Sequence, residues 1–212
     1  MKQLLFFLVL PLQLVLVVFF VLNIMDVRSR IRICLDKVDT ISNSSLDSYV
    51  PYLVAAEDHR YFQHFGVDPI GVARAIFVKL SRGKIQGAST IEQQFVRVAT
   101  EDYERSLKRK LREQVVAMML SRKRTKLDIA TAYLSIAHYG QGLNGLTGLT
   151  LVVGGNLKLA SEADKISIVS RLKYPEPSLQ STAWMSKHMN RVKYIEDKLA
   201  SVGHRKSEKF SH

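Results

Sequence analysis

A carboxylate lies in the sequence at a position where a helical pattern calls for an apolar side chain. Val50, Leu53 and Val54 follow the spacing of one helix face, and Glu57 and Tyr61 continue the same stripe. Burying a carboxylate costs free energy unless the group is paired or protonated. Desolvation raises the pKa of a carboxylate, which suits a general base that works near neutral pH. Glu57 is therefore a candidate general base.

The alternative for Glu57 is a purely structural ion pair. A helix that ends at Tyr61 would leave Glu57 within reach of Arg60 or Arg74, and structural ion pairs also perturb carboxylates. Spacing alone favours this second interpretation. The choice between the two depends on which other residues accompany Glu57 along the chain.

Three short motifs follow one another from Glu57 onward. The first reads Glu-Asp-x-x-Tyr-x-x-His-x-Gly from Glu57 to Gly66, the second reads Gly-Ala-Ser-Thr-Ile-Glu-Gln-Gln from Gly87 to Gln94, and the third consists of Arg109, Lys110 and Glu113. In this order and at these separations, the motifs resemble the peptidoglycan glycosyltransferase family, which is glycosyltransferase family 51. Members of that family polymerise lipid-linked disaccharide into glycan strands. The resemblance covers about residues 46–175.

The sequence departs from the family pattern at several positions. Tyr61 stands where the first motif has Phe, and Arg97 replaces a Lys that follows the second motif. Arginine can bind a phosphate in a bidentate manner, so Arg97 is a workable substitute. A fourth motif is matched at Lys126, Ile129, Tyr133 and Leu134, but Thr131 replaces a Glu and Ser135 replaces an Asn. These two changes bear on how active the protein is more than on its fold.

The resemblance implies a substitution at an anomeric carbon. The donor is the growing chain, joined by an α-linkage to a lipid diphosphate, and the acceptor is the 4-hydroxyl of an incoming lipid-linked disaccharide. Attack from the opposite side inverts the anomeric carbon and gives a β-1,4 bond. Such a reaction needs a base on the hydroxyl and positive charge at the leaving diphosphate.

The family's functional residues fall on two groups of positions here. Glu57 is the expected general base, and Glu113 is the second catalytic residue, which either orients the cations or holds a divalent metal such as Mg²⁺ or Mn²⁺. The residues expected to bind substrate are Asp58, Arg60, His64, Ser89, Thr90, Gln93, Gln94, Arg97, Arg109 and Lys110. Among them, Arg97, Arg109 and Lys110 are the cations expected at the diphosphate. No other cofactor is implied.

The chain is strongly basic. Its 212 residues include 31 Lys and Arg against 19 Asp and Glu, which gives a formal net charge of +12. Such an excess indicates an anionic partner: nucleic acid, acidic lipid or phosphate. Aromatic residues do not alternate with basic ones as in a groove for single-stranded nucleic acid, so nucleic acid is not an expected partner. With the resemblance, the expected partners are lipid II, the growing glycan chain, membrane lipids and other proteins of cell-wall synthesis.

A long apolar run opens the sequence. Residues 3–25 carry no charge and consist mostly of Leu, Val and Phe. At about 1.5 Å per residue, this run can cross a hydrocarbon core of roughly 30 Å. A cleaved signal peptide is the alternative, but its apolar region would be shorter and would end in small residues. We therefore expect a retained transmembrane anchor over residues 1–27.

Charge and resemblance give opposite orientations for this anchor. Lys2 precedes the apolar run, whereas Arg28, Arg30 and Arg32 follow it, so the positive-inside rule favours a cytoplasmic domain. The resemblance implies the outer face of the bacterial cytoplasmic membrane, where the lipid-linked substrate is polymerised. We adopt the outer face, in which case the three arginines rest on anionic headgroups.

The expected fold is mainly α and, by resemblance, lysozyme-like. A polar connector over residues 28–45 is expected to lead to a glycosyltransferase domain over residues 46–202 and a basic tail over 203–212. Caps and apolar spacing predict helices after Asp68-Pro69, after Ser89-Thr90, and over about residues 102–122, 125–139, 162–172 and 182–202. The glycine-rich stretch 140–155 is expected to be irregular. No Ser-x-x-Lys transpeptidase motif follows, so a monofunctional chain is expected.

Two other functions stay open on the sequence. An inactive relative would bind lipid-linked precursor or a cell-wall partner without polymerising it, which would explain the altered fourth motif. A lysozyme-like hydrolase is the other alternative, although hydrolysis gives no reason for so many cations beside the carboxylates.

Overall fold

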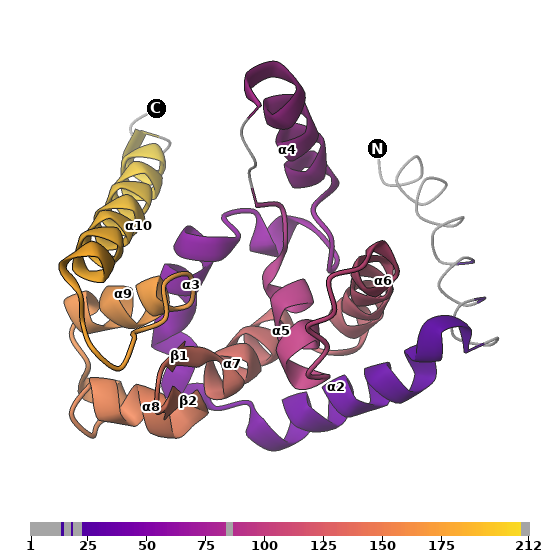
Figure 1. Ribbon diagram of the computed structural model, residues 1–212, viewed down its shortest axis with the longest axis horizontal. Helices are drawn as coiled ribbons and strands as arrows, with labels where there is room; N and C mark the ends of the chain where they lie inside the picture. Colours follow the sequence, from indigo (N-terminus) through magenta and orange to yellow (C-terminus); the bar gives the residue numbers. More distant parts are fainter. Residues whose placement is uncertain (1–13, 15–17, 19–22, 84–86, 209–212) are drawn as a thin grey trace.

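The computed structural model of the protein describes residues 14, 18, 23–83 and 87–208. Within these residues the fold is mainly helical, as predicted, with one two-stranded sheet (Figure 1). The α-helices are α2 (Val27–Ile41), α3 (Val50–Glu57), α4 (Pro69–Arg82), α5 (Ile91–Ala99), α6 (Leu107–Lys123), α7 (Lys126–Ile136), α8 (Gly145–Val152), α9 (Glu162–Arg171) and α10 (Thr182–Glu208). The 3-10 helices and strands are η1 (Ile24–Asp26), η2 (Ser44–Tyr49), η3 (Tyr61–Gln63), η4 (Leu157–Leu159), β1 (His138–Gly140) and β2 (Leu143–Asn144).

Helix α5 lies at the centre of the fold and packs against both α6 and α7 (Figure 1). Its Ile91 and Phe95 are fully buried, and Val96 and Ala99 are almost so. Burying a large apolar side chain contributes roughly 1.5–3 kcal/mol, so this face fixes α5 firmly in the core. The second motif runs into the first turn of α5, and the core therefore determines where that motif lies.

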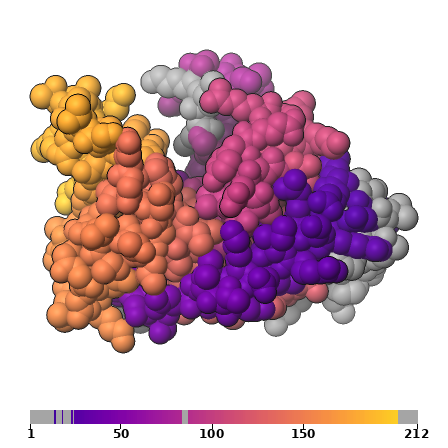
Figure 2. Space-filling view, turned by 60° about the horizontal axis from the view of Figure 1, so that its bottom comes forward, coloured from indigo at the N-terminus to yellow at the C-terminus, as the bar shows by residue number. Residues whose placement is uncertain are grey.

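Helix α2 occupies most of the segment expected to be a polar connector, residues 28–45. Val27, Ile31, Cys34 and Val38 recur at helical spacing and are all buried, where α2 packs on α6 and α7. Figure 2 shows α2, in indigo, lying along one face of the molecule. The segment is polar on average, which is why a connector was expected there.

Most helices begin where a capping residue predicts. Asp68 caps α4 and Thr90 caps α5 through side-chain oxygens that accept backbone N–H groups. Helix α6 begins at Leu107, later than predicted, because Ser106 supplies its cap. Asn43 caps η2, which in turn leads into α3.

The glycine-rich stretch 140–155 contains regular structure, contrary to the prediction. Strands β1 and β2 pair antiparallel, and α8 follows directly after them. Gly145, the first residue of α8, has a φ of +54°, and a Cβ atom there would lie 2.6 Å from the carbonyl oxygen of Ser135. Only glycine tolerates both conditions, so it lets the chain turn tightly from the hairpin into α8.

Helix α4 projects away from the other helices (Figure 1). Its Ile76, Phe77 and Leu80 are all exposed. Neighbouring apolar side chains of this size on a helix surface are typical of a surface that contacts a partner or a membrane.

The apolar run at residues 3–25 lies almost entirely outside the described residues. In the part of the chain that the structure describes, no helix is both long enough and apolar enough to cross a membrane. The transmembrane anchor therefore stays a prediction.

Candidate active site

Glu57 is the last residue of α3, and its side chain is 15% exposed. Its Oε1 accepts a hydrogen bond from Arg191 Nη2 at 2.7 Å, and its Oε2 accepts one from Gln94 Nε2 at 3.0 Å. The ion pair joins α3 to α10, more than a hundred residues further along the chain. The carboxylate is therefore partly buried and fixed by two donors, as a positioned base requires.

The structural partners expected for Glu57 are engaged elsewhere. Arg60 Nε lies 3.2 Å from Asp68 Oδ1, and Arg74 Nη1 lies 3.4 Å from His59 Nε2. Helix α3 also ends at Glu57 rather than at Tyr61. The interpretation of Glu57 as a local pair with Arg60 or Arg74 is thus wrong, although Glu57 does form an ion pair.

A cleft of about 850 Å³ opens beside Glu57. Of the residues predicted to form the site, it is lined by Glu57, Asp58, Ser89, Gln94 and Arg97. Basic side chains dominate its walls, since its two carboxylates are accompanied by Arg74, Arg97, Lys173, Lys187, Arg191 and Lys198. A cleft with this excess of positive charge favours an anionic ligand.

Asp58 and His64 form a buried pair at the edge of this cleft. His64 Nε2 and Asp58 Oδ2 lie 3.0 Å apart, and Asp58 Oδ2 also accepts the backbone N–H of Ile91 at 3.4 Å. Because Ile91 is the first residue of α5, Asp58 holds the start of that helix. Asp58 lines the cleft and His64 does not, so His64 supports the site by holding Asp58.

Thr90 and Gln93 lie inside the protein and do not line the cleft. Thr90 Oγ1 donates to the carbonyl oxygen of Gly66 at 2.7 Å, and Gln93 Nε2 reaches the same oxygen at 3.4 Å. The last residue of the first motif is thereby joined to the second motif. Of the four residues predicted from the second motif to bind substrate, Ser89 and Gln94 reach the cleft and the other two support it.

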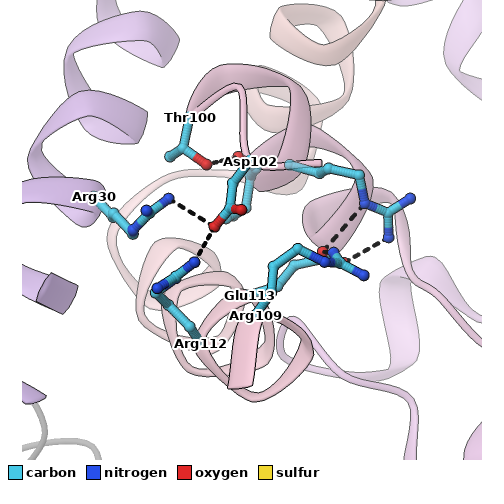
Figure 3. Close-up of a pocket in the computed structure, with 8 residues that line it drawn as sticks. Arg30, Thr100, Asp102, Arg109, Arg112 and Glu113 are labelled. Carbon is cyan, nitrogen blue, oxygen red and sulfur yellow. Dashed lines mark hydrogen bonds and ion pairs between the residues drawn. The ribbon is translucent and has the colours of Figure 1, made fainter. Parts of the chain in front are cut away.

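Glu113 is buried between two arginines (Figure 3). Arg97 binds it through Nε at 3.2 Å and Nη2 at 2.9 Å, and Arg109 Nη1 binds its Oε2 from the preceding helical turn. Glu113 is 4% exposed at its side chain, whereas Arg97 is 31% exposed and reaches the cleft. This geometry favours the role in which Glu113 orients cations.

The surroundings of Glu113 do not fit a divalent metal. Both carboxylate oxygens already accept guanidinium groups, and a metal ion beside two arginines would meet strong repulsion. Among the described residues, one group has the composition and proximity of metal ligands, namely Asp58, His64 and Glu92. There the ammonium group of Lys126 already binds Glu92.

Arg109, Arg112 and Arg30 extend the positive charge behind Glu113 (Figure 3). Asp102 accepts Arg30 Nη1 at 3.0 Å and also binds Arg112. Burial alone would raise the pKa of Asp102, but the hydrogen bond and charge of Arg112, with the charge of Arg30, lower it below its ordinary value. Arg30 therefore connects α2 to α6 through Asp102. From the sequence, this arginine was expected to contact lipid headgroups instead.

Lys110 is exposed on α6. Unlike Arg97 and Arg109, it lines neither the cleft nor the small cavity around Glu113 that Figure 3 shows. Thr131 and Ser135, the altered positions of the fourth motif, also lie away from the cleft. Thr131 Oγ1 donates to the carbonyl of Leu127 at 3.1 Å, and Ser135 Oγ donates to the carbonyl of Thr131 at 2.8 Å. Both hydroxyls are thus satisfied within α7.

Two residues help to position Glu57 although they were not predicted to do so. Arg191 binds it directly, and the hydroxyl of Tyr133 donates to Gln94 Oε1 at 2.7 Å. The signal for Arg191 is present in the sequence, because it shares a buried helical stripe with Trp184, His188 and Ile195. Like Glu57, this arginine is a charged residue on an apolar helical stripe.

Known proteins resemble most of the chain. The family model described as "Transglycosylase" matches residues 34–198. A monofunctional glycosyltransferase of Staphylococcus epidermidis is 31% identical over 167 residues, which cover 74% of this chain and 62% of the relative. Penicillin-binding protein 1A of Aquifex aeolicus is 29% identical over 180 residues, which cover 80% of this chain and 24% of the relative.

Penicillin-binding protein 1A of Rickettsia felis is 38% identical over 108 residues, which cover 49% of this chain and 14% of the relative. This chain therefore spans less than two thirds of each of these three relatives. The family match, however, includes α3, α5, α6, α7 and α9 and all of the residues that line the cleft. The chain belongs to the transglycosylase family.

Proposed function

We propose that this protein is a peptidoglycan glycosyltransferase, which polymerises lipid-linked disaccharide (lipid II) into β-1,4-linked glycan strands and releases polyprenyl diphosphate. The observation that carries the proposal is a positioned carboxylate, Glu57, in a cleft whose walls are mostly basic. A glycosyl transfer from a lipid diphosphate needs both features at once. The relatives named glycosyltransferase and penicillin-binding protein support the same reaction.

In this reaction Glu57 removes the proton from the 4-hydroxyl of the acceptor. The oxygen then forms a bond to the anomeric carbon of the donor from the side opposite the diphosphate, whose bond to that carbon breaks. Inversion follows from this geometry. Each oxygen of the Glu57 carboxylate accepts one hydrogen bond within the protein, and a carboxylate has about four acceptor sites, so sites are left for the acceptor hydroxyl.

Arg97 is the cation best placed to meet the leaving diphosphate. Its Nε and Nη2 hold Glu113, and a guanidinium has five N–H donors, so donors on the remaining nitrogen are free to face the cleft. Glu113 and Arg109 hold the arginine in place from behind. Lys110 is exposed on the same helix as Arg109 and adds to the positive charge of that helix.

The lipid part of the substrate fits the position of α4. Arg74 of this helix lines the cleft, while its Ile76, Phe77 and Leu80 are exposed. An apolar surface beside a basic cleft suits a substrate that joins a lipid to a diphosphate. We propose that the domain works at the outer face of the bacterial cytoplasmic membrane, held there by a single span over residues 3–25 and by α4.

Product analysis with the full-length protein in detergent tests this function. Incubation with labelled lipid II should yield glycan strands that lysozyme digests. Binding of lipid II without conversion would instead identify an inactive relative, and shortening of preformed glycan would identify a hydrolase. Either of these two results would overturn the proposal.

A further inference from the structure

We propose that Tyr133 and Arg191 are positioning residues, which hold the Glu57 carboxylate in place by acting on its two oxygens separately. Neither residue was expected to contribute to the site from the sequence. The proposal rests on the function proposed above, because it assigns both residues a role relative to the general base. It assigns neither residue a contact with the sugar that reacts.

We call Arg191, Tyr133 and Gln94 the clamp of Glu57. Its first arm is Arg191 on α10. Its Nη2 donates to Glu57 Oε1 at 2.7 Å and also to the carbonyl oxygen of Ala56 at 2.6 Å. Helix α3 ends at Glu57, so the carbonyl of Ala56 is one of the terminal groups without a partner inside the helix. A positive charge at this end of a helix is also favourable. Arg191 therefore fixes the last turn of α3 together with its carboxylate.

The second arm runs from Tyr133 on α7 through Gln94 on α5. Gln94 Nε2 donates to Glu57 Oε2 at 3.0 Å, while Gln94 Oε1 accepts the hydroxyl of Tyr133 at 2.7 Å. An amide has one donor end and one acceptor end. The Glu57 carboxylate can only accept, so the donor end of Gln94 faces it, and the hydroxyl of Tyr133 then holds the acceptor end in place. A rotated amide would place its carbonyl oxygen against the carboxylate, and two acceptors repel each other.

Tyr133 retains the proton that it donates to Gln94. It is almost completely buried, and burial together with the nearby Glu57 carboxylate raises the pKa of its hydroxyl far above the usual value. The hydroxyl therefore keeps its proton throughout the range in which the protein works. Tyr133 does not line the cleft, so any effect that it has on the reaction must pass through Gln94.

A positioning role predicts how the kinetics respond. A base that moves by a fraction of an ångström loses its reach to the acceptor hydroxyl, while substrate still binds the basic walls of the cleft. Loss of the arm that contains Tyr133 should therefore lower kcat and leave KM nearly unchanged, whereas loss of Arg191, which also lines the cleft, should lower kcat and can raise KM as well. A residue needed only for folding would lower thermal stability without changing the kcat of the folded fraction.

Tyr133→Phe, compared with Tyr49→Phe, tests the second arm. Tyr49 is also fully buried, and its hydroxyl donates to the carbonyl of Leu157 at 3.0 Å, with no link to Glu57. Each variant removes one buried hydrogen bond. We expect Tyr133→Phe to lower kcat roughly threefold to tenfold, with KM within about twofold, and Tyr49→Phe to keep the wild-type kcat. Equal kcat values for the two variants would overturn the role of Tyr133.

A double-mutant cycle shows whether Tyr133 acts through Gln94. In the Gln94→Ala background, the amide that Tyr133 orients is gone, so Tyr133→Phe should cause no further loss of kcat. A second loss of the same size as in the wild-type background would mean that Tyr133 acts by another route, and the proposed arm would be wrong.

The first arm is tested by Arg191→Lys and Arg191→Gln, with Lys193→Ala as a control. Lys193 is exposed on the same helix and does not line the cleft. Lysine keeps the charge beside Glu57, whereas glutamine does not, so Arg191→Lys should retain several times more kcat than Arg191→Gln. Equal kcat for these two variants would overturn the role of Arg191. This pair also keeps the proposal testable if Tyr133→Phe fails to fold.

The measured activities distinguish an error about the clamp from an error about the proposed reaction. If the wild-type protein makes no glycan strands, or if Glu57→Gln keeps its activity, the function itself is wrong. If the wild-type protein is active and Glu57→Gln is not, but the Tyr133 and Arg191 variants match their controls, only the clamp is wrong.

Discussion

Among single residues, Arg97 and Glu113 form an ion pair with one member in the core and the other at the cleft. Glu113 is almost completely buried, whereas Arg97 is about one third exposed and lines the cleft. Arg109 binds the same carboxylate from behind. Two guanidinium groups against one carboxylate leave an excess positive charge, and Arg97 is the member that presents this charge to the ligand.

Substitutions of Arg97 should therefore separate charge from hydrogen bonding. We expect Arg97→Ala to lower the initial polymerisation rate about tenfold to a hundredfold, because a charge-assisted hydrogen bond to the diphosphate contributes roughly 1.5–3 kcal/mol. Arg97→Lys should restore much of the rate, since it keeps a charge that can reach both Glu113 and the ligand. Arg97→Gln should not restore it. The measurement is the initial rate at fixed lipid II concentration.

Lys108→Ala is the control for these variants, because Lys108 is an exposed cation on α6 outside the cleft. It should polymerise at the wild-type rate. Equal rates for the Ala, Gln and Lys variants of residue 97 would remove this arginine from the site.

Single residues could be predicted where their side chains break a local pattern. Glu57 stood out because it lies on an apolar stripe, and the structure places it in the cleft. Thr90 and Gln93 were assigned to substrate, but they bind the carbonyl oxygen of Gly66 inside the protein. A motif shows which residues belong together, but the direction of each side chain depends on packing that spacing does not specify.

At the scale of the element, the loop after α3 is joined to α5 and α6 around Gly66. Its carbonyl oxygen accepts Thr90 and Gln93 from α5. Its Cα faces α6, where a Cβ atom would lie 2.4 Å from the carbonyl carbon and oxygen of Ala117. The glycine of the first motif is thus required by close packing as well as by its φ of +79°.

Gly66→Ala should accordingly destabilise the fold more than Gly142→Ala. Both glycines have positive φ, at +79° and +75°, but nothing lies within 4 Å of a Cβ atom at Gly142. Backbone strain alone costs about 1–2 kcal/mol, and overlap with α6 adds roughly 1–3 kcal/mol at Gly66. Chemical denaturation measures the free energy of unfolding of each variant. Equal losses at the two positions would show that the close contact with Ala117 does not matter.

Elements could be predicted where a cap and an apolar stripe agree, as at Asp68 for α4 and Thr90 for α5. Helix α2 was missed because its stripe, Val27 to Val38, lies in a segment that is polar on average. Its burial depends on α6 and α7, which follow much later in the sequence. Amphipathic segments of this kind gain their helical structure from tertiary packing rather than from local propensity.

At the scale of the whole molecule, the cleft brings together residues from both ends of the domain. Glu57 on α3 meets Arg191 on α10, and Gln94 on α5 meets Tyr133 on α7. No local rule predicts such contacts, because they depend on how the helices stack around α5. The family resemblance predicted the motifs and the basic cleft, but not the contribution of α10 to its wall.

The structure also changes how the membrane orientation can be tested. Cys34 is buried in α2, and burial raises the pKa of its thiol to about 12, so it will not react with an impermeant thiol reagent in the folded protein. Asp36 is exposed on the same helix. We expect Asp36→Cys to be labelled in intact spheroplasts, while the wild-type protein stays unlabelled. Labelling of Asp36→Cys only after the membrane is broken would place the domain in the cytoplasm.

The variant Glu57→Gln tests whether Glu57 is the general base of a glycosyl transfer. Glutamine keeps the shape of the side chain and can still accept a hydrogen bond from Arg191, so the variant should fold, with a lower melting temperature because Arg191 loses its counter-charge. Its initial rate of glycan polymerisation should fall about a hundredfold to ten-thousandfold, as is typical when a general base is lost. A folded Glu57→Gln variant that polymerises lipid II at nearly the wild-type rate would show that Glu57 is not the general base.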